Sequence, residues 1–204
     1  MIPVLTTQMV TIDEQRGERR DTLDHRWTEF LTRCGLVPIA VPNHPEAAAH
    51  LLTAIPTAGV LLTGGNDLSA YGGTAPERDA TERLLVTEAL RRHRGVLGVC
   101  RGMQMLQHHF GVSLARVPKH AGVDHEIEFL GKARIVNSYH RWAARDSADP
   151  LDVWARAADG VVESVGSHEL RVAGIMWHPE RVTVPDPHDI ALFRDLFASV
   201  PCAR

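Results

Sequence analysis

Short apolar runs alternate with amphipathic stretches along the first half of the chain. Residues 36–41, 60–62 and 96–99 form continuous apolar runs, which are typical of strands buried on both faces of a sheet. The spacing of apolar residues predicts helices near 23–31, 46–52 and 81–92, and another after residue 100 that stops at Gly111. The pattern therefore predicts an α/β fold with a central, mostly parallel sheet and helices on both of its faces.

The pattern changes in the second half, where short apolar segments flank turn residues. One hairpin is predicted from 127–129 and 134–136 around Gly131-Lys132, and another from 161–165 and 170–177 around Gly166-Ser167. Asp186-Pro187 is a helix-start signal, followed by apolar residues on one helical face. We expect a single domain over residues 1–204, with a small antiparallel extension joined to the α/β core.

The composition narrows the class of protein. With 204 residues, 44% of them apolar and 23% charged, the chain suits one globular domain with a substantial core. The net charge of −3 and the lack of a basic run argue against a nucleic-acid partner. We expect no membrane association, because the N-terminus lacks a signal-peptide pattern and no apolar run reaches about eighteen residues. Three widely spaced cysteines exclude a disulfide framework and favour a reducing cytoplasm.

Cys100 is the candidate nucleophile. It lies in Gly98-Val99-Cys100-Arg101-Gly102, between a predicted strand and a predicted helix, as the nucleophile does in the elbow of many hydrolases. A helix N-terminus favours the thiolate form of a cysteine, and the Arg101 N–H would face a developing oxyanion. The alternative is a buried cysteine at a strand end beside chance glycines. Cys34 and Cys202 have no such setting and are interpreted as a core residue and a tail residue.

His178 and Glu180 are the candidate base and its orienting carboxylate. His178 follows a predicted strand, and Pro179 holds it in an extended conformation, so Glu180 can reach the same side as His178. The alternative is a strand-end histidine that is hydrogen-bonded in the core. His120 and His125 could be a metal pair, but no cysteine or carboxylate stands at ligand spacing in the sequence. We therefore predict no metal, and no cofactor.

The chain resembles the class I glutamine amidotransferases, and within them the γ-glutamyl-γ-aminobutyrate hydrolase-like (peptidase C26-like) group, over nearly its whole length. The matching motifs are, in order, Leu62-Thr63-Gly64-Gly65-Asn66-Asp67, Arg78-Asp79 with Glu82, Gly98 to Gln104, Val136 to His140, Asp159 to Glu163, and Met176 to Glu180. The resemblance implies a flavodoxin-like glutamine amidotransferase type 1 domain and a Cys100-His178-Glu180 triad that attacks a γ-glutamyl amide. It also implies an oxyanion hole from the Gly65 and Arg101 backbones, and substrate recognition near Gln104, Asn137, Ser138, Tyr139, His140 and Arg141.

One departure from the group concerns the substrate. The familiar hydrolases of the group carry a second histidine and a glutamine after the position of His140, where this chain has Arg141-Trp142. A cation and an indole favour an anionic, nucleotide-bearing leaving group. Residues 18–27, Asn66-Asp67 and residues 174–178 also resemble a bacterial γ-glutamyl-CDP-amidate hydrolase branch that serves surface-polysaccharide (capsule) biosynthesis. The alternative for the Arg19-Arg20 stretch is a solvated helix start.

Three functions remain to be compared. The leading hypothesis is a free-standing hydrolase that releases glutamate from a small-molecule γ-glutamyl amide, with a homodimer allowed. The second is a glutaminase subunit that supplies ammonia to a separate synthetase, since no synthetase domain fits within this chain. The third is a binding protein without catalysis, which the intact triad disfavours because a binder needs no such residues. A serine α/β-hydrolase is disfavoured because the elbow carries cysteine.

Overall fold

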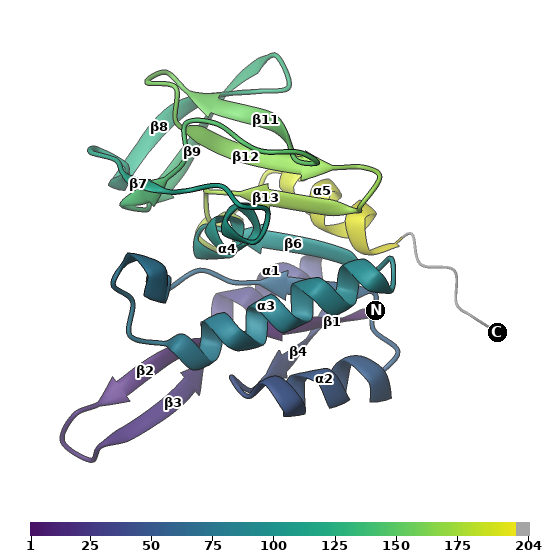
Figure 1. Cartoon of the computed structure of the whole chain (residues 1–204). Coiled ribbons are helices and arrows are strands. Elements are labelled where there is room, and N and C mark those ends of the chain that lie inside the picture. Colours follow the sequence, from purple (N-terminus) through teal and green to yellow (C-terminus); the bar gives the residue numbers. More distant parts are fainter. Residues whose placement is uncertain (199–204) are drawn as a thin grey trace.

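The computed structural model describes residues 1–198 and is built around a nine-stranded sheet with the order β4-β1-β5-β6-β13-β12-β11-β8-β9 (Figure 1). The first five strands in this order are mutually parallel. They are β4 (Leu36–Val41), β1 (Ile2–Thr7), β5 (Gly59–Leu62), β6 (Gly95–Val99) and β13 (Val172–Ile175). The sequence prediction of a central, mostly parallel sheet is therefore confirmed.

The other four strands extend the sheet in antiparallel pairs. They are β12 (Val162–Ser167), β11 (Asp152–Ala157), β8 (Ala121–Phe129) and β9 (Lys132–Tyr139). Two small separate pairs are β2 (Met9–Asp13) with β3 (Glu18–Thr22), and β7 (Ala115–Arg116) with β10 (Trp142–Ala143). Arg134 on β9 lies 5.0 Å over the ring of Trp177, just beyond β13, so the antiparallel half curls back toward the parallel strands.

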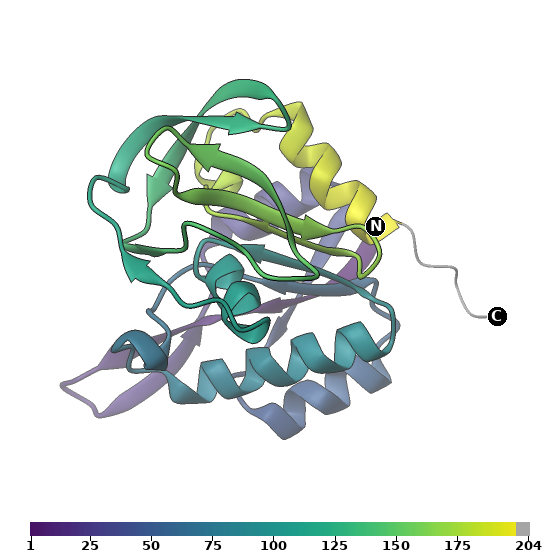
Figure 2. The same ribbon diagram turned by 45° about the horizontal axis from the view of Figure 1, so that its top comes forward.

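Helices cover both faces of the parallel strands (Figures 1 and 2). One face carries α2 (Pro45–Ala54), α3 (Pro76–Arg91) and α4 (Arg101–His109), and the other carries α1 (His25–Arg33) and α5 (Pro187–Ala198). Two short 3-10 helices cover Ser69–Tyr71 and Pro179–Arg181. On the α1/α5 side the Phe30 and Phe193 rings meet edge to face at 4.8 Å, which closes that half of the core.

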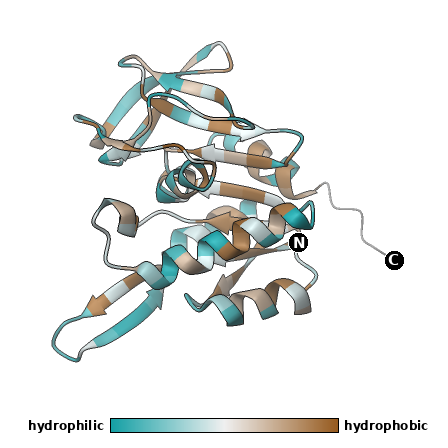
Figure 3. Ribbon diagram, in the orientation of Figure 1, coloured by the Kyte–Doolittle hydropathy of each residue, from teal (hydrophilic) through white to brown (hydrophobic). Residues whose placement is uncertain are grey.

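The burial of the central parallel strands explains why the sequence predicts them. Every residue of β5, β6 and β13 is buried, whereas β3 is exposed along most of its length and hydrophilic (Figure 3). Central strands therefore read as unbroken apolar runs, and the β2–β3 hairpin does not. Within residues 1–198 no helix is long and apolar enough to cross a membrane.

Three sequence interpretations need correction. Gly166-Ser167 is not a turn but the end of β12, and the connection to β13 lies at 168–171. Trp154 packs so closely over Gly166 that a Cβ there would lie 2.0 Å from the Trp154 ring, so the glycine is needed for this packing.

The other two corrections concern element boundaries. The α3 helix begins at Pro76 rather than near residue 81, and the Arg19-Arg20 stretch lies in a strand rather than at the start of a helix. The interpretation of Cys202 falls outside the described residues.

Candidate active site

Cys100 stands at a sharp turn between β6 and α4. Its backbone angles, φ 53° and ψ −107°, are strained for a residue with a side chain, and such strain is concentrated at functional sites. A Cβ on Gly98 would lie 2.4 Å from the Gly102 carbonyl carbon, and one on Gly102 would lie 2.1 Å from the Leu62 carbonyl oxygen. Both glycines are therefore required for α4 to start this close to β5. The turn leaves Cys100 at the N-terminus of α4, where the helix dipole favours a negative sulfur.

His178 and Glu180 follow the neighbouring strand, β13. Because β13 pairs with β6 in parallel, with Ile175 opposite Val99, the two strands end at the same edge of the sheet. His178 Nδ1 lies 2.7 Å from Glu180 Oε1, and both side chains are buried. This contact fixes the imidazole so that Nε2 is the free ring nitrogen, and Nε2 has no hydrogen-bond partner among the described residues. The pair has the geometry of a base and its orienter.

Gly64 lies between the cysteine and the histidine. A Cβ on Gly64 would meet His178 Cε1 at 2.8 Å and Cys100 Cβ at 3.7 Å, so the two side chains lie on one side of this loop. A cavity of about 70 Å³ lies beside it, lined by Gly64, Gly65, His178 and Glu180 among others. A larger cavity of about 230 Å³ is lined by Asn137 and Trp177, and also by His178. We place the chemistry at the smaller one because it adjoins the glycine loop.

The charge state of His178 depends on Cys100. Burial lowers the pKa of the imidazole, but the negative charge of a Cys100 thiolate, the contact with that sulfur and the Glu180 carboxylate together raise the pKa to about 9. The imidazole is therefore protonated at neutral pH, which is the state that can donate a proton to a leaving group.

We expect His178 to titrate near pH 9 in the unaltered protein and at lower pH in Cys100→Ala, because burial, which lowers the pKa of the imidazole, is then opposed by Glu180 without Cys100. Since this folded-state pKa lies above the ordinary 6.5, protonation stabilises the fold fully below about pH 6.5, and this stabilisation is lost as the pH rises through about 9. NMR titration of the imidazole resonances measures the shift, with Cys34→Ala as the control. Equal titration in Cys100→Ala and the unaltered protein would contradict the coupling.

Arg78 holds the backbone of residues 63–65, the glycine loop, through hydrogen bonds. Its buried guanidinium donates to the carbonyl oxygens of Thr63 (2.7 Å), Gly64 (2.9 Å) and Gly65 (3.0 Å), and to Glu82 Oε1 (2.9 Å). The C=O and N–H of a trans peptide point in opposite directions. Because the Gly64 carbonyl faces Arg78, the Gly65 N–H points away from Arg78. Glu82 also accepts from Arg101, whose side chain pairs with Asp79 as well.

The residues predicted to recognise substrate divide between two faces of β9. The Asn137 side chain makes two hydrogen bonds to the backbone of His178, at 2.9 and 2.7 Å, and the Tyr139 ring stands edge-on to His178 at 5.5 Å. Ser138 and His140 turn to the opposite, buried face, where Ser138 Oγ donates to the His120 carbonyl oxygen. Gln104 on α4 donates to the Trp142 carbonyl oxygen at 2.8 Å. A recognition role for these five remains a prediction.

The arginines and the tryptophan that the sequence suggested for substrate binding differ in their surroundings. Arg141 is exposed. The Trp142 indole packs against Tyr71 at 5.0 Å, with Arg116 over its ring. Arg19 pairs with Glu77, and Arg20 with Glu18 and Asp13, so both guanidinium groups already have carboxylate partners.

The sequence interpretation missed Arg181. It contributes to the small cavity that Gly64, Gly65 and His178 line, and it lies 4.5 Å over the Tyr139 ring. It directly follows Glu180, so its adjacency to the triad was the available signal. Among the arginines considered for substrate binding, Arg181 is the one that lines this cavity, and its Nε lies 3.5 Å from Glu180 Oε1.

A second cluster of titratable groups lies within the antiparallel half. Glu163 on β12 is fully buried and lies 3.1–3.5 Å from ring nitrogens of His120, His125 and His140. Burial raises the pKa of its carboxyl group, but the three imidazoles hold that pKa well below its ordinary value. The sequence argument against a metal assumed that no carboxylate accompanies His120 and His125. That reason is wrong, because folding brings Glu163 to them from a distant part of the chain.

The overall arrangement is found in a solved structure of low sequence similarity. A Thermoplasma acidophilum protein described as one of the subunits of GMP synthase superposes with a TM-score of 0.72 at 16% identity, covering 97% of this chain and 94% of that one. This likeness defines the fold class, a class I glutamine amidotransferase fold.

Sequence comparisons define the family. The Peptidase C26 family model matches residues 1–129 and 125–180, so the chain belongs to the Peptidase C26 family. It is 29% identical over 182 residues to the gamma-glutamyl-CDP-amidate hydrolase of Campylobacter jejuni, covering 86% of this chain and 88% of that protein. It is 27% identical over 208 residues to the gamma-glutamyl-gamma-aminobutyrate hydrolase PuuD of Escherichia coli, covering 81% of each chain. Its relatives thus include hydrolases of γ-glutamyl compounds.

Proposed function

We propose that the protein is a cysteine-dependent hydrolase that cuts a γ-glutamyl amide bond and releases glutamate. The observation that carries the proposal is the juxtaposition of a strained Cys100 at a helix N-terminus with a His178 whose Nδ1 is held by Glu180 at 2.7 Å. This arrangement supplies a nucleophile, a proton carrier and its orienter within one edge of the sheet. Membership of the Peptidase C26 family supports a hydrolase.

The proposed reaction has two stages. Cys100 Sγ attacks the γ-carbonyl carbon, and the resulting oxyanion is stabilised by the backbone N–H groups of Gly65 and Arg101. His178 Nε2 gives its proton to the leaving nitrogen, the C–N bond breaks, and a thioester between glutamate and Cys100 remains. A water molecule, deprotonated by His178, then attacks the thioester, and glutamate and the free thiol are released. Glu180 keeps the imidazole in one orientation throughout.

For the substrate, we propose a γ-glutamyl amide whose leaving group carries phosphate, such as γ-glutamyl-CDP-amidate. The Campylobacter jejuni relative named for that substrate matches most of this chain. Arg181 lines the candidate cavity, and Arg141 is exposed two residues after the end of β9, the strand that carries Asn137 and Tyr139. A guanidinium binds phosphate oxygens with two parallel hydrogen bonds, so these arginines suit an anionic leaving group.

A comparison of three substrates tests this assignment. We expect kcat/KM for γ-glutamyl-CDP-amidate to exceed that for glutamine and for γ-glutamyl-γ-aminobutyrate, and the preference to weaken in Arg181→Ala and Arg141→Ala and at high salt. Arg91→Ala removes an exposed arginine from the far end of α3 and should leave the preference unchanged. A tenfold preference for glutamine, about 1.4 kcal/mol of transition-state stabilisation, would favour an ammonia-supplying glutaminase instead.

A further inference from the structure

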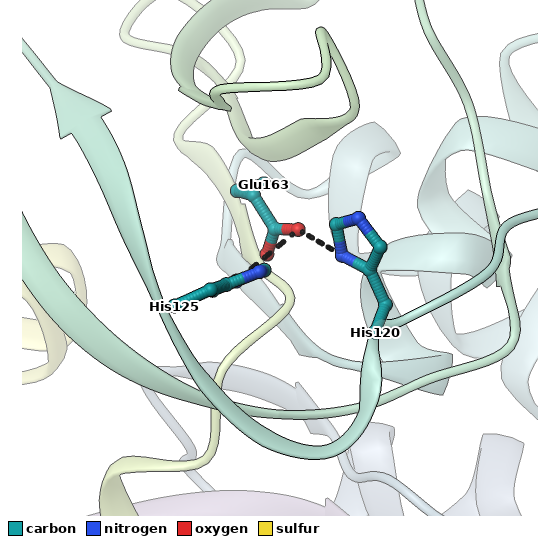
Figure 4. Close-up of side chains that lie close together, drawn as sticks. All are labelled: His120, His125 and Glu163. Carbon is teal, nitrogen blue, oxygen red and sulfur yellow. Dashed lines mark ion pairs between the residues drawn. The ribbon is translucent and has the colours of Figure 1, made fainter.

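Three side chains in the antiparallel half converge on one point (Figure 4). His120 immediately precedes β8, His125 lies on β8, and Glu163 lies on β12. Their ligand atoms all lie within 4.8 Å of one another, although Glu163 is far from both histidines in the sequence. His120 and Glu163 are buried, so bulk water cannot satisfy these groups.

The orientation of His120 leaves a ring nitrogen directed at a carboxylate. Its Nε2 lies 3.2 Å from Asp159 Oδ2, a hydrogen bond that requires the proton on Nε2. In the neutral imidazole Nδ1 then carries a lone pair, and Nδ1 faces Glu163 Oε1 at 3.1 Å. Two electron-rich atoms at this distance need a proton or a cation between them. A histidine that binds metal through one nitrogen usually donates its other N–H to a carboxylate, as His120 does to Asp159.

Two of the three ligand spacings suit a tetrahedral metal site, and the two imidazole nitrogens lie within 4.8 Å of each other, so a bound ion would draw the rings together. Zinc binds nitrogen and oxygen ligands at about 2.0–2.2 Å, so tetrahedral ligand atoms lie about 3.3–3.5 Å apart. Glu163 Oε1 lies 3.1 Å from His120 Nδ1 and 3.5 Å from His125 Nε2. These three atoms nevertheless have no properly directed hydrogen bond among the described residues. Their directions therefore suit a shared ion better than bonds to one another.

We propose that His120 Nδ1, His125 Nε2 and the Glu163 carboxylate bind one Zn²⁺-like divalent transition-metal ion. Two imidazoles and a carboxylate form a ligand set that zinc accepts, with a fourth position for water. His140 Nε2 also lies 3.3 Å from Glu163 Oε1 and has no directed hydrogen bond among the described residues, so it is a further nitrogen near the site. The ion ties β8 to β12 and stiffens the hairpin whose second strand holds Asn137 against His178, so its role is structural.

Zinc titration in a Cys100→Ala background tests the site, since this background removes a competing thiolate. The protein is stripped with a chelator and titrated with Zn²⁺ against a chromophoric competitor. We expect one Zn²⁺ per chain, binding at least tenfold weaker in His125→Ala and Glu163→Gln, and unchanged binding in His50→Ala, which removes an exposed histidine of α2. Co²⁺ should give tetrahedral absorption bands that His125→Ala lacks.

The competing explanation is a proton on His120 in place of a metal. Thermal melts without metal show whether each variant is folded, and Glu163→Gln keeps the shape of the side chain if His125→Ala is unstable. Equal zinc affinity in all folded variants would overturn the proposal. So would imidazole resonances of His120 and His125 that titrate identically with and without Zn²⁺.

Discussion

Replacing Cys100 with alanine should lower kcat/KM for any γ-glutamyl amide that the protein hydrolyses by about four to six orders of magnitude. Removal of the nucleophile from a triad leaves only the contribution of binding and of the oxyanion hole. Hydrolysis rates measured on γ-glutamyl-CDP-amidate and on glutamine would show the loss with either substrate. Residual activity near that of the unaltered protein would exclude Cys100 as the nucleophile and overturn the proposed function.

Cys34 provides the matched control for this experiment. It is also a buried cysteine, but burial raises the pKa of its thiol to about 12, so it is an unreactive core residue. Cys34→Ala should therefore retain kcat/KM close to that of the unaltered protein. Circular dichroism and melting curves of both variants separate loss of chemistry from loss of fold.

Replacing Arg78 with methionine should lower the free energy of unfolding by about 3–5 kcal/mol, the range for breaking a buried ion pair. The variant leaves the Thr63, Gly64 and Gly65 carbonyl groups without their donor and removes one cation from Glu82. Equilibrium unfolding in urea measures the change. Because the Gly64–Gly65 peptide would be free to rotate, kcat should also fall more than KM changes.

Arg91→Met is the control, since it makes the same substitution in the same helix at an exposed residue paired with Glu88. It should change the unfolding free energy by about 0.5 kcal/mol or less. Arg78→Lys should be intermediate, because an ammonium keeps the charge but cannot span the set of acceptors. Equal stability of Arg78→Met and Arg91→Met would show that the glycine loop holds its shape without Arg78.

The central strands, the Cys100 elbow and the His178–Glu180 pair could each be predicted because each is local in sequence, and the catalytic role of these residues stays a prediction. A continuous apolar run identifies β6, the elbow follows directly, and His178 and Glu180 are two residues apart. The packing of Trp154 on Gly166 could not be predicted, since it joins β11 to β12 through a side-chain contact that leaves no periodic signal. The turn that Gly166 was predicted to form is consequently absent.

The cluster around Glu163 could not be predicted either, because it joins residues from distant parts of the chain. His120 and His125 are close in sequence, but their carboxylate comes from a strand that pairs with neither of them directly. Successive side chains of a strand point to opposite faces, so the sequence alone separates Asn137 and Tyr139 from Ser138 and His140. The family resemblance implies these recognition residues as one set, and the structure divides them between two faces.

The curl of the antiparallel half brings β9 against the segment that follows β13, and this contact is called the seam. Arg134 on Trp177 and the paired hydrogen bonds of Asn137 to the His178 backbone hold that seam. Because the hydrogen bonds reach His178 itself, a displacement of β9 is transmitted to the histidine without passing through β12, β11 and β8. The position of β9 and the orientation of His178 are therefore mechanically coupled, so a movement that separates β9 from the segment after β13 also moves His178.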